Sequence, residues 1–293
     1  MALTFSLLKM IFLAATSLTT VGVGLLYTYQ RSLIYPAAMN NARGFTEKPS
    51  KYNLPFEEAF LETRDGERLH SFLLLHDETS PNYKSKTVLI LCPNAGNIGH
   101  SLPIVELFYK NFGYNVFIYS YRGYGSSTGE ATERGLKVDA DTVMAFLSKH
   151  EQISKTSIVL YGRSLGGAVG IYIASKNYSL IKGVILENTF LNLRKCIPHI
   201  FPLLANFTSL CSDLWDSEND ILKTSRDVKF LFLSATDDEI VPPNHMIELY
   251  RLCQSHQKKI FKFNGSKHND TVTFPGYWDL ISDFIKAIEP VEK

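Results

Sequence analysis

The sequence has little of what marks several classes of protein. Its four cysteines are widely spaced and form no C-x-x-C pair, which argues against a zinc site or a disulfide framework. Its 30 basic and 29 acidic residues nearly balance, and neither sign forms a long run, so the chain has no charged stripe for binding nucleic acid. It also has no internal repeat. A chain of 293 residues with this composition predicts one sizeable globular domain plus an additional segment.

Charge is absent from a stretch near the amino terminus, residues 10–30 (MIFLAATSLTTVGVGLLYTYQ). At about 1.5 Å per residue, a helix of this length spans the core of a bilayer, and Tyr27 and Tyr29 suit a membrane interface. We therefore expect residues 1–30 to form a single transmembrane anchor, in the endoplasmic reticulum or another endomembrane. A cleavable signal peptide is the alternative, although its hydrophobic core is usually shorter. The flanking basic residues favour a cytosolic domain only slightly.

After a connector at residues 31–55, which has no sustained periodicity, strand and helix patterns alternate to the end of the chain. Strand patterns at residues 58–63 and 69–75 flank Asp65-Gly66 and predict a hairpin. Further strands are predicted at 87–92, 115–120, 157–161, 183–187, 228–234 and 259–264, and helices at 102–112, 132–149, 165–175, 244–253 and 278–288. This order predicts a doubly wound, mostly parallel α/β sheet in one domain of residues 56–293.

Residues 162–166 read G-x-S-x-G between an expected strand and an expected helix. In this spacing the serine, Ser164, lies on a sharp turn that leaves no room for side chains two residues before and two residues after it. Gly162 and Gly166 meet that need. The turn exposes the hydroxyl and points the N–H of Leu165 toward a substrate oxygen that gains charge. An ordinary glycine-rich connection is the alternative, so the surrounding sequence must discriminate.

The alternation of strands and helices lapses at about residues 190–227. Pro198, Pro202 and large apolar residues are mixed there without a strand pattern. We expect a short helical cap over the serine. Two ordinary helices packed against the core are the alternative, because an apolar stripe on a helix usually faces a core.

A serine hydroxyl needs a base to become a nucleophile, and the base needs a group that orients it. His268 lies in a polar loop after a predicted strand near the end of the chain, where the base comes in the order Ser, Asp or Glu, His. Asp237, Asp238 and Glu239 follow the preceding strand, and of these we choose Asp238. Asp270 is less suitable, because so short a loop would have to fold back on itself. A solvated histidine and a solvated acidic turn are the alternatives.

With these residues in this order on an alternating sheet, the sequence resembles the α/β-hydrolase superfamily over about residues 56–288. Within that superfamily it is similar to the membrane-anchored fungal bud-emergence-suppressor type and its animal abhydrolase-domain relatives, which also carry one N-terminal hydrophobic segment. The motifs that carry the resemblance are YRGYGSSTGEA (121–131), GRSLGGA (162–168), ENTF (187–190), DEIVPP (238–243) and HNDT (268–271). The resemblance places the family acid at Asp238 and the family base at His268.

The loop NAGNIGH, residues 94–100, resembles the family's oxyanion loop. The family usually has a His-Gly pair before this loop, whereas this sequence has Cys92-Pro93, and it usually has an aspartate where this sequence has Ser120. Proline lacks a backbone donor. The donor that the resemblance assigns to the oxyanion hole is the N–H of Asn94, which is present, and Leu165 supplies the second. A loop that merely contains glycine is the alternative.

Together these residues predict a membrane-anchored serine hydrolase that cleaves ester or thioester bonds of an acyl or lipid-like substrate, including acylated protein, through an acyl-enzyme. His268 would take the proton of Ser164, and Asp238 would fix the imidazole tautomer. No metal and no organic cofactor are implied. The alternative is a hydrolase fold without activity that serves as a membrane-tethered interaction module.

Overall fold

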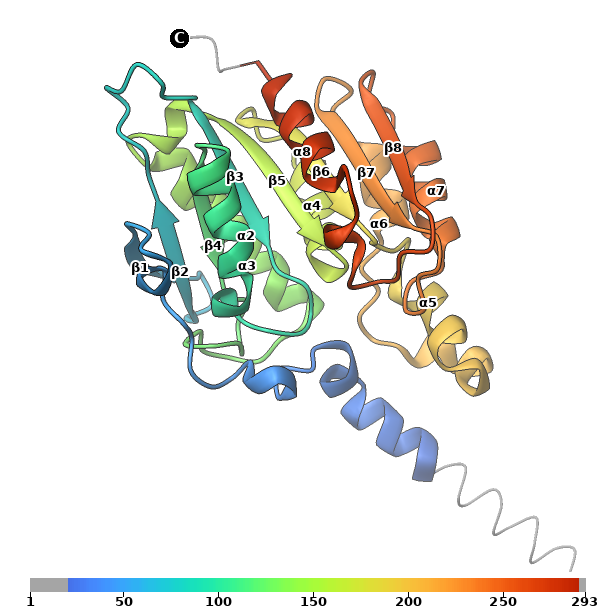
Figure 1. Ribbon diagram of the computed structural model, residues 1–293. Coiled ribbons are helices and arrows are strands. Elements are labelled where there is room, and N and C mark those ends of the chain that lie inside the picture. Colours follow the sequence, from blue (N-terminus) through green and yellow to red (C-terminus); the bar gives the residue numbers. More distant parts are fainter. Residues whose placement is uncertain (1–20, 290–293) are drawn as a thin grey trace, which may run out of the picture.

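An eight-stranded sheet forms the centre of the structure, a computed structural model that describes residues 21–289 (Figure 1). Neighbouring strands follow the order β1-β2-β4-β3-β5-β6-β7-β8, and the pairs β1·β2 and β2·β4 are antiparallel while the others are parallel. The strands are β1 (Glu57–Glu62), β2 (Arg68–Leu74), β3 (Lys86–Leu91), β4 (Asn115–Tyr119), β5 (Ser157–Arg163), β6 (Ile181–Glu187), β7 (Lys229–Ala235) and β8 (Lys258–Phe263). The mostly parallel α/β sheet predicted from the sequence is confirmed.

Helices cover both faces of the sheet. The α-helices of the described residues are α2 (Leu102–Glu106), α3 (Glu133–Lys149), α4 (Leu165–Ser175), α5 (Leu193–Ile200), α6 (Ser217–Asp220), α7 (Pro243–Leu252) and α8 (Tyr277–Lys286), together with a helix at residues 21–34. In Figure 1, α2 and α8 lie on the near face of the sheet, and α3 and α4 lie behind it. The sheet is therefore the middle layer of three.

The predicted hairpin forms one edge of the sheet. β1 and β2 pair in register from Glu57 opposite Leu73 to Glu62 opposite Arg68. In the turn between them Gly66 adopts a φ of 89°, which glycine reaches without a Cβ clash. The hairpin therefore forms at Asp65-Gly66, where the sequence places it.

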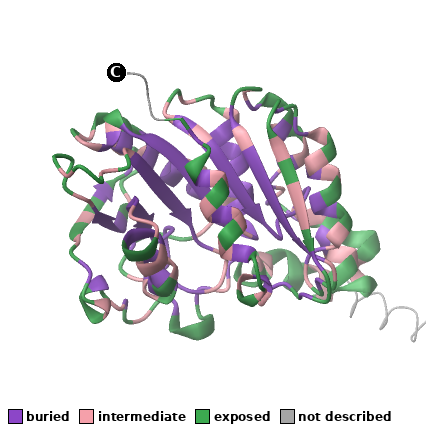
Figure 2. Ribbon diagram, turned by 45° about the horizontal axis from the view of Figure 1, so that its top comes forward, coloured by how far each residue is buried: buried purple, intermediate pink, exposed green. Residues whose placement is uncertain are grey.

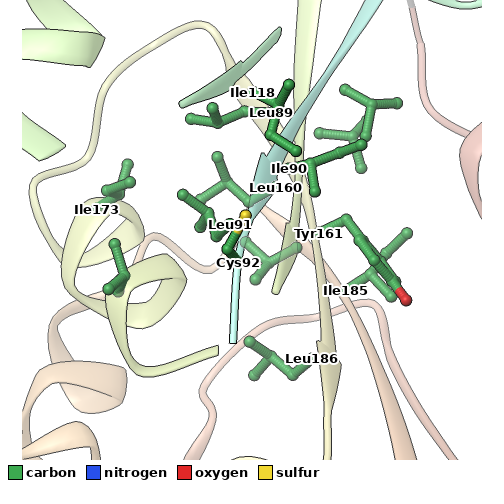
Figure 3. Close-up of a cluster of buried hydrophobic side chains, with 14 of the residues drawn as sticks. Leu89, Ile90, Leu91, Cys92, Ile118, Leu160, Tyr161, Ile173, Ile185 and Leu186 are labelled. Carbon is green, nitrogen blue, oxygen red and sulfur yellow. The ribbon is translucent and has the colours of Figure 1, made fainter. Parts of the chain in front are cut away.

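The central strands are buried because helices cover both of their faces. Every residue of β3 and β4 is buried, and Figure 2 shows the buried colour along the central strands, with exposed residues on the outer helices and loops. Leu91, Leu160 and Leu186 of β3, β5 and β6 belong to one apolar cluster with Ile173 of α4 (Figure 3). This rigid core fixes the carboxyl ends of the parallel strands.

The amino-terminal region differs in its boundaries from the sequence prediction. The helix that enters the described part at residue 21 continues to residue 34, past the expected end of the anchor at residue 30. The expected anchor, residues 10–30, lies partly outside the described residues. Within residues 21–289 we find no helix with both the length and the apolar character needed to cross a bilayer. The connector then runs to β1 through two short 3₁₀ helices, Met39–Asn41 and Pro49–Tyr52.

The segment at residues 190–227 is helical, as its lack of a strand pattern suggests. It contains α5, the 3₁₀ helix η6 (Pro202–Leu210), α6 and the short η7 (Ile221–Lys223). The side chain of Asn192 caps the start of α5 by accepting a hydrogen bond from the N–H of Lys195 (3.0 Å). No residue of η6 is buried, so this part of the segment does not belong to the core.

An ion-pair network holds the segment after β4 in place. The guanidinium of Arg122 pairs with Asp139 (2.7 Å between nitrogen and oxygen) and with Asp65 (2.8 Å). The side chain of Asp139 is fully buried, and burial raises its pKa to about 6 although Arg122 opposes the shift. The positive charge of Arg122 therefore offsets the free-energy cost of burying the Asp139 carboxylate.

Replacing Arg122 with alanine should lower the free energy of unfolding by about 3–5 kcal/mol, because Asp139 is left buried without a counter-charge. The pKa of Asp139 should then rise further above its unfolded value of 3.8. A raised carboxyl pKa in the folded state means that stability falls as pH increases, so the loss should be larger at pH 8 than at pH 5. Urea unfolding at both pH values measures this. Asp65→Asn, at the more exposed partner, should cost under about 1 kcal/mol, and equal losses in the two variants would contradict the explanation.

Candidate active site

Ser164 lies between the end of β5 and the start of α4 in a strained backbone conformation, with φ of 54° and ψ of −119°. Such a conformation costs a residue other than glycine about 1–3 kcal/mol and persists only where its surroundings enforce it. Here the N–H of Ser164 donates to the carbonyl of Glu187 (2.9 Å), and the hydroxyl of Thr189 donates to the carbonyl of Ser164 (2.7 Å). The last residue of β6, Glu187, and Thr189 just after it therefore hold the backbone N–H and carbonyl of Ser164 in place.

The two glycines of G-x-S-x-G supply the room that the spacing predicts. A Cβ atom on Gly162 would overlap the carbonyl oxygen of Gly166, and one on Gly166 would overlap the carbonyl oxygen of Leu91. Any side chain at either position would push α4 away from β5 or from β3. The start of α4 therefore packs directly on the backbone at the end of β3.

Asp238 and His268 form a buried pair. The carboxylate oxygen Oδ2 of Asp238, just after β7, lies 2.8 Å from Nδ1 of His268, in the loop after β8, and both side chains are almost fully buried. The other carboxylate oxygen, Oδ1, accepts the N–H groups of Ile240 (2.9 Å) and Val241 (2.7 Å). An ionised Asp238 holds the proton of the imidazole on Nδ1, which leaves Nε2 as an acceptor.

The neighbouring acids have other contacts. Asp237 is exposed and accepts the hydroxyl of Thr236. Glu239 accepts the N–H of His268 (3.1 Å), and Asp270 accepts the N–H of Lys267 (2.7 Å). Of the acids considered in the sequence, only Asp238 contacts the imidazole ring among the described residues. Glu239 and Asp270 shape the loop that carries it.

Asn188, just after β6, lies within the ENTF motif, but no role was assigned to it from the sequence. Its side chain donates to the carbonyl of His268 (3.1 Å) and to the hydroxyl of Thr271 (2.9 Å), and accepts the N–H of Ala235 (2.8 Å) at the end of β7. The next residue, Thr189, holds the carbonyl of Ser164. Two consecutive residues thus connect the serine turn to the histidine loop.

A buried carboxyl group lies next to this connection. Glu187 is fully buried and accepts hydrogen bonds from the hydroxyls of Tyr161 (3.0 Å) and Tyr277 (2.5 Å). Burial raises the pKa of Glu187, while the charge of Arg163 opposes the shift. The backbone that clamps Ser164 is therefore anchored in the core by a hydrogen-bonded side chain.

The loop after β3 brings Asn94 to the same cavity as Ser164, a cavity of about 190 Å³ that both residues line. The hydroxyl of Tyr124 donates to the carbonyl of Asn94 (2.7 Å), and that of Tyr121 donates to the carbonyl of Cys92 (2.9 Å). Leu165 is the first residue of α4, where backbone N–H groups have no partner within the helix. The two expected oxyanion donors therefore belong to the first turn of α4 and to the loop after β3, the two elements that meet where Gly166 approaches Leu91.

These elements meet because β3, β5, β6, β7 and β8 run parallel and end at one edge of the sheet. Asn94, Ser164, Asp238 and His268 all follow strands at that edge. The arrangement provides a hydroxyl that lines an apolar cavity, with an oriented imidazole and, among the described residues, unpaired backbone donors at the same edge of the sheet. These are the kinds of group that acyl transfer needs. Within residues 21–289, no group of three or more His, Cys, Asp or Glu side chains is arranged to hold a metal ion.

Comparisons with known proteins show the family and the fold. Residues 87–210 match the family model described as alpha/beta hydrolase fold. The uncharacterized membrane protein YNL320W of Saccharomyces cerevisiae is 50% identical, over 94% of this chain and 96% of its own length. Protein bem46 of Schizosaccharomyces pombe is 43% identical over 96% and 94%, and the alpha/beta hydrolase domain-containing protein WAV2 of Arabidopsis thaliana is 32% identical over 94% of each.

Among solved structures, the esterase Pf2001 of Pyrococcus furiosus resembles this fold with a TM-score of 0.68 and 19% sequence identity, over 83% of this chain and 95% of that one. At this identity the similarity concerns the fold. The resemblance that the sequence motifs suggest is confirmed by the relatives.

Proposed function

Because this chain belongs to the α/β-hydrolase family, we propose that it is a serine hydrolase that cleaves an ester or thioester of an acyl or lipid-like substrate. The observation that carries the proposal is the combination of a strained Ser164 with a buried Asp238–His268 pair at one edge of the sheet. A solvated histidine would not be buried against a carboxylate that backbone donors hold in place. In serine proteases a histidine held by a carboxylate in this way activates a serine hydroxyl, and we propose the same role for His268.

In the proposed mechanism, Nε2 of His268 takes the proton of the Ser164 hydroxyl while its oxygen attacks the acyl carbon. The carbonyl oxygen gains negative charge and is stabilised by the N–H groups of Leu165 and Asn94. As the tetrahedral intermediate collapses, His268 gives its proton to the departing alcohol or thiol, which leaves an acyl-enzyme. Water, activated by His268 in the same way, then hydrolyses the acyl-enzyme and regenerates the serine.

Asp238 supports these reaction steps in two ways. Its negative charge lies 2.8 Å from Nδ1, so it favours the imidazolium that forms when His268 accepts a proton. Its hydrogen bonds to the N–H groups of Ile240 and Val241 keep the carboxylate from rotating, so the ring keeps its orientation. No metal or organic cofactor is needed for these steps.

The proposal is tested by labelling the full-length protein with a fluorophosphonate probe, which reacts only with an activated serine. We expect stoichiometric labelling and hydrolysis of a short-chain ester. A hydrolase fold without activity, serving as a membrane-tethered interaction module, would bind neither probe nor substrate. Absence of labelling in a protein that retains its circular dichroism spectrum would therefore favour the interaction module.

We further propose that residues 10–30 anchor the protein in an endomembrane as a single span, with the hydrolase domain as its carboxyl-terminal part. The proposal is supported by the absence of charge from this stretch and by the S. cerevisiae relative, which is described as a membrane protein. A substrate carried by a membrane, such as a lipid or an acylated protein, would then be within reach of Ser164.

The anchor predicts that the protein stays in the membrane pellet after washing with alkaline carbonate, because a spanning helix is not released by high pH. Sequencing the amino terminus of the purified native protein is the control for a signal peptide. Cleavage would give a start about two-thirds of the way along the uncharged run or just beyond it, together with a soluble product. Either of those results would exclude the anchor.

A further inference from the structure

The helix at residues 21–34 is fixed to the hydrolase domain by a side chain that makes two hydrogen bonds. The amide oxygen of Gln30 accepts the N–H of Ser212 (2.7 Å), and the amide nitrogen of Gln30 donates to the carbonyl of Leu210 (3.3 Å). Both partners are backbone groups at the end of η6. Gln30 therefore ties the helix to the helical segment that follows β6.

The end of the same helix makes a second, buried set of contacts. The hydroxyl of Tyr35 donates to the carboxylate of Asp213 (2.7 Å) and accepts the indole N–H of Trp215 (2.9 Å). The side-chain amide of Asn94 donates to the carbonyl of Ile34 (3.2 Å). The helix end thus contacts both the segment after β6 and the loop that carries an expected oxyanion donor, so its position relative to Ser164 is set.

One face of this helix lines the cavity that contains Ser164. The residues on that face are Val23, Leu26, Tyr27, Gln30, Leu33 and Ile34. Their spacing of three or four residues places them on one side of a helix, and from Val23 to Leu33 they extend about 15 Å at 1.5 Å per residue. The opposite wall is apolar and comes from α5 and η6, including Ile197, Leu204 and Phe207. Figure 1 shows the helix and the α5–η6 segment together below the carboxyl ends of the parallel strands.

Among the described residues, no charged side chain lines this cavity, and the polar side chains that do are few. Ser164 and Asn94 stand on the side of the sheet, and Gln30 is already bonded to backbone groups. Away from Ser164 and Asn94, a charged or strongly hydrogen-bonding ligand would lose water here and find few partners. An unbranched hydrocarbon chain has no polar group to desolvate and would bury apolar surface against both walls.

We propose that this cavity holds the acyl chain of the substrate and that the helix at residues 21–34 forms the wall that selects for chain length. The inference rests on the proposed function, because the carbonyl end of the chain must reach Ser164. The amino-terminal segment then has a role beyond anchoring: it completes the substrate site. Removing residues 1–30 would therefore open one side of the cavity, since Val23, Leu26, Tyr27 and Gln30 would be lost.

The test compares two leucines that are neighbours in the helix. Leu26 lines the cavity and is 36% exposed, whereas Leu25 does not line it and is 54% exposed. The kcat/KM of the full-length protein is measured for p-nitrophenyl acetate, butyrate, octanoate and laurate. Each buried methylene should raise kcat/KM by up to about fourfold, so kcat/KM should rise with the length of the acyl chain in the unmodified protein. Leu26→Gln should lower the laurate-to-acetate ratio at least tenfold, and Leu25→Gln should leave the ratio within twofold.

Phe207→Gln, on the opposite wall, gives an independent variant in case Leu26→Gln folds poorly, and it should lower the same ratio. Partition of long esters into micelles or membranes is the same for all variants, so it cancels when they are compared. Equal ratios in the Leu25 and Leu26 variants, or a flat chain-length profile in an enzyme that labels with fluorophosphonate, would overturn the inference and leave the proposed function intact. Absence of both labelling and hydrolysis would overturn the two together.

Discussion

Ser164→Ala should reduce ester hydrolysis by about 10⁵- to 10⁶-fold while leaving the fold unchanged. In subtilisin, loss of the nucleophilic serine costs about 10⁶-fold in turnover, and binding and the oxyanion donors account for the remaining activity. Alanine accepts the positive φ at this position about as well as serine does. The turn also remains clamped, because the hydrogen bonds of Ser164 to Glu187 and Thr189 use its backbone. We expect stability to change by less than about 0.5 kcal/mol.

The matched control is Ser175→Ala, at the far end of the same helix α4. Its hydroxyl donates to the carbonyl of Tyr172 and takes no part in the site. Steady-state hydrolysis of a short-chain ester and thermal unfolding are measured for both variants. Substantial hydrolysis by the Ser164 variant, or equal losses of activity in the two variants, would show that Ser164 is not the nucleophile.

Asp238→Asn should lower turnover by about 10⁴-fold, as the corresponding change does in serine proteases. The surrounding hydrogen bonds give the reason. The N–H groups of Ile240 and Val241 need an acceptor, so the amide oxygen of the introduced asparagine would face them and its NH₂ group would face His268. Nδ1 of His268 would then have to accept a hydrogen bond, and its proton would move to Nε2. A ring protonated at Nε2 cannot take the proton of Ser164.

Asp237→Asn is the control, because Asp237 is adjacent in sequence but exposed. Its removal should change turnover by less than about threefold, in keeping with the small energies of exposed polar contacts. Both variants are compared by kcat for one ester over a range of pH. If the Asp237 variant loses more activity than the Asp238 variant, the orienting role belongs to Asp237.

The order of the elements and the positions of Ser164, Asp238 and His268 could be predicted because they depend on local patterns. A buried strand has a recognisable composition, and G-x-S-x-G reports a constraint between residues that are close in sequence. The choice between Asp237 and Asp238 is harder, since both follow β7 directly. The choice depends on the direction in which each side chain points. The side chain of Asp238 is buried in the protein, and that of Asp237 is exposed to solvent.

Asn188 could not have been identified in this way. Its three contacts are with Ala235, His268 and Thr271, all more than forty residues away in sequence, so no local pattern reveals them. The burial of Glu187 could not be predicted either, because a glutamate at the end of a strand is usually exposed. Only the parallel arrangement of β6, β7 and β8 brings these partners together.

The wall formed by the helix at residues 21–34 escapes prediction for another reason. The uncharged run that begins at residue 10 has no charged face on any side of a helix, so its pattern identifies no inner face. The length of the run predicts an anchor, and the boundary at residue 30 follows from Arg31. The hydrogen bonds of Gln30 and Tyr35 join this helix to the segment after β6, and their partners lie about 180 residues away in the sequence.

A covalent acyl group at Ser164 is the step on which the proposed function depends most. The direct measurement is to mix the full-length protein with excess p-nitrophenyl ester, quench in acid within milliseconds to seconds, and locate the added mass by peptide mass spectrometry. We predict a burst of p-nitrophenol of about one equivalent and an acyl group on the peptide that contains Ser164, absent from the Ser164→Ala protein. Turnover without any acylated peptide, or an acyl group on a different residue, would contradict the central claim.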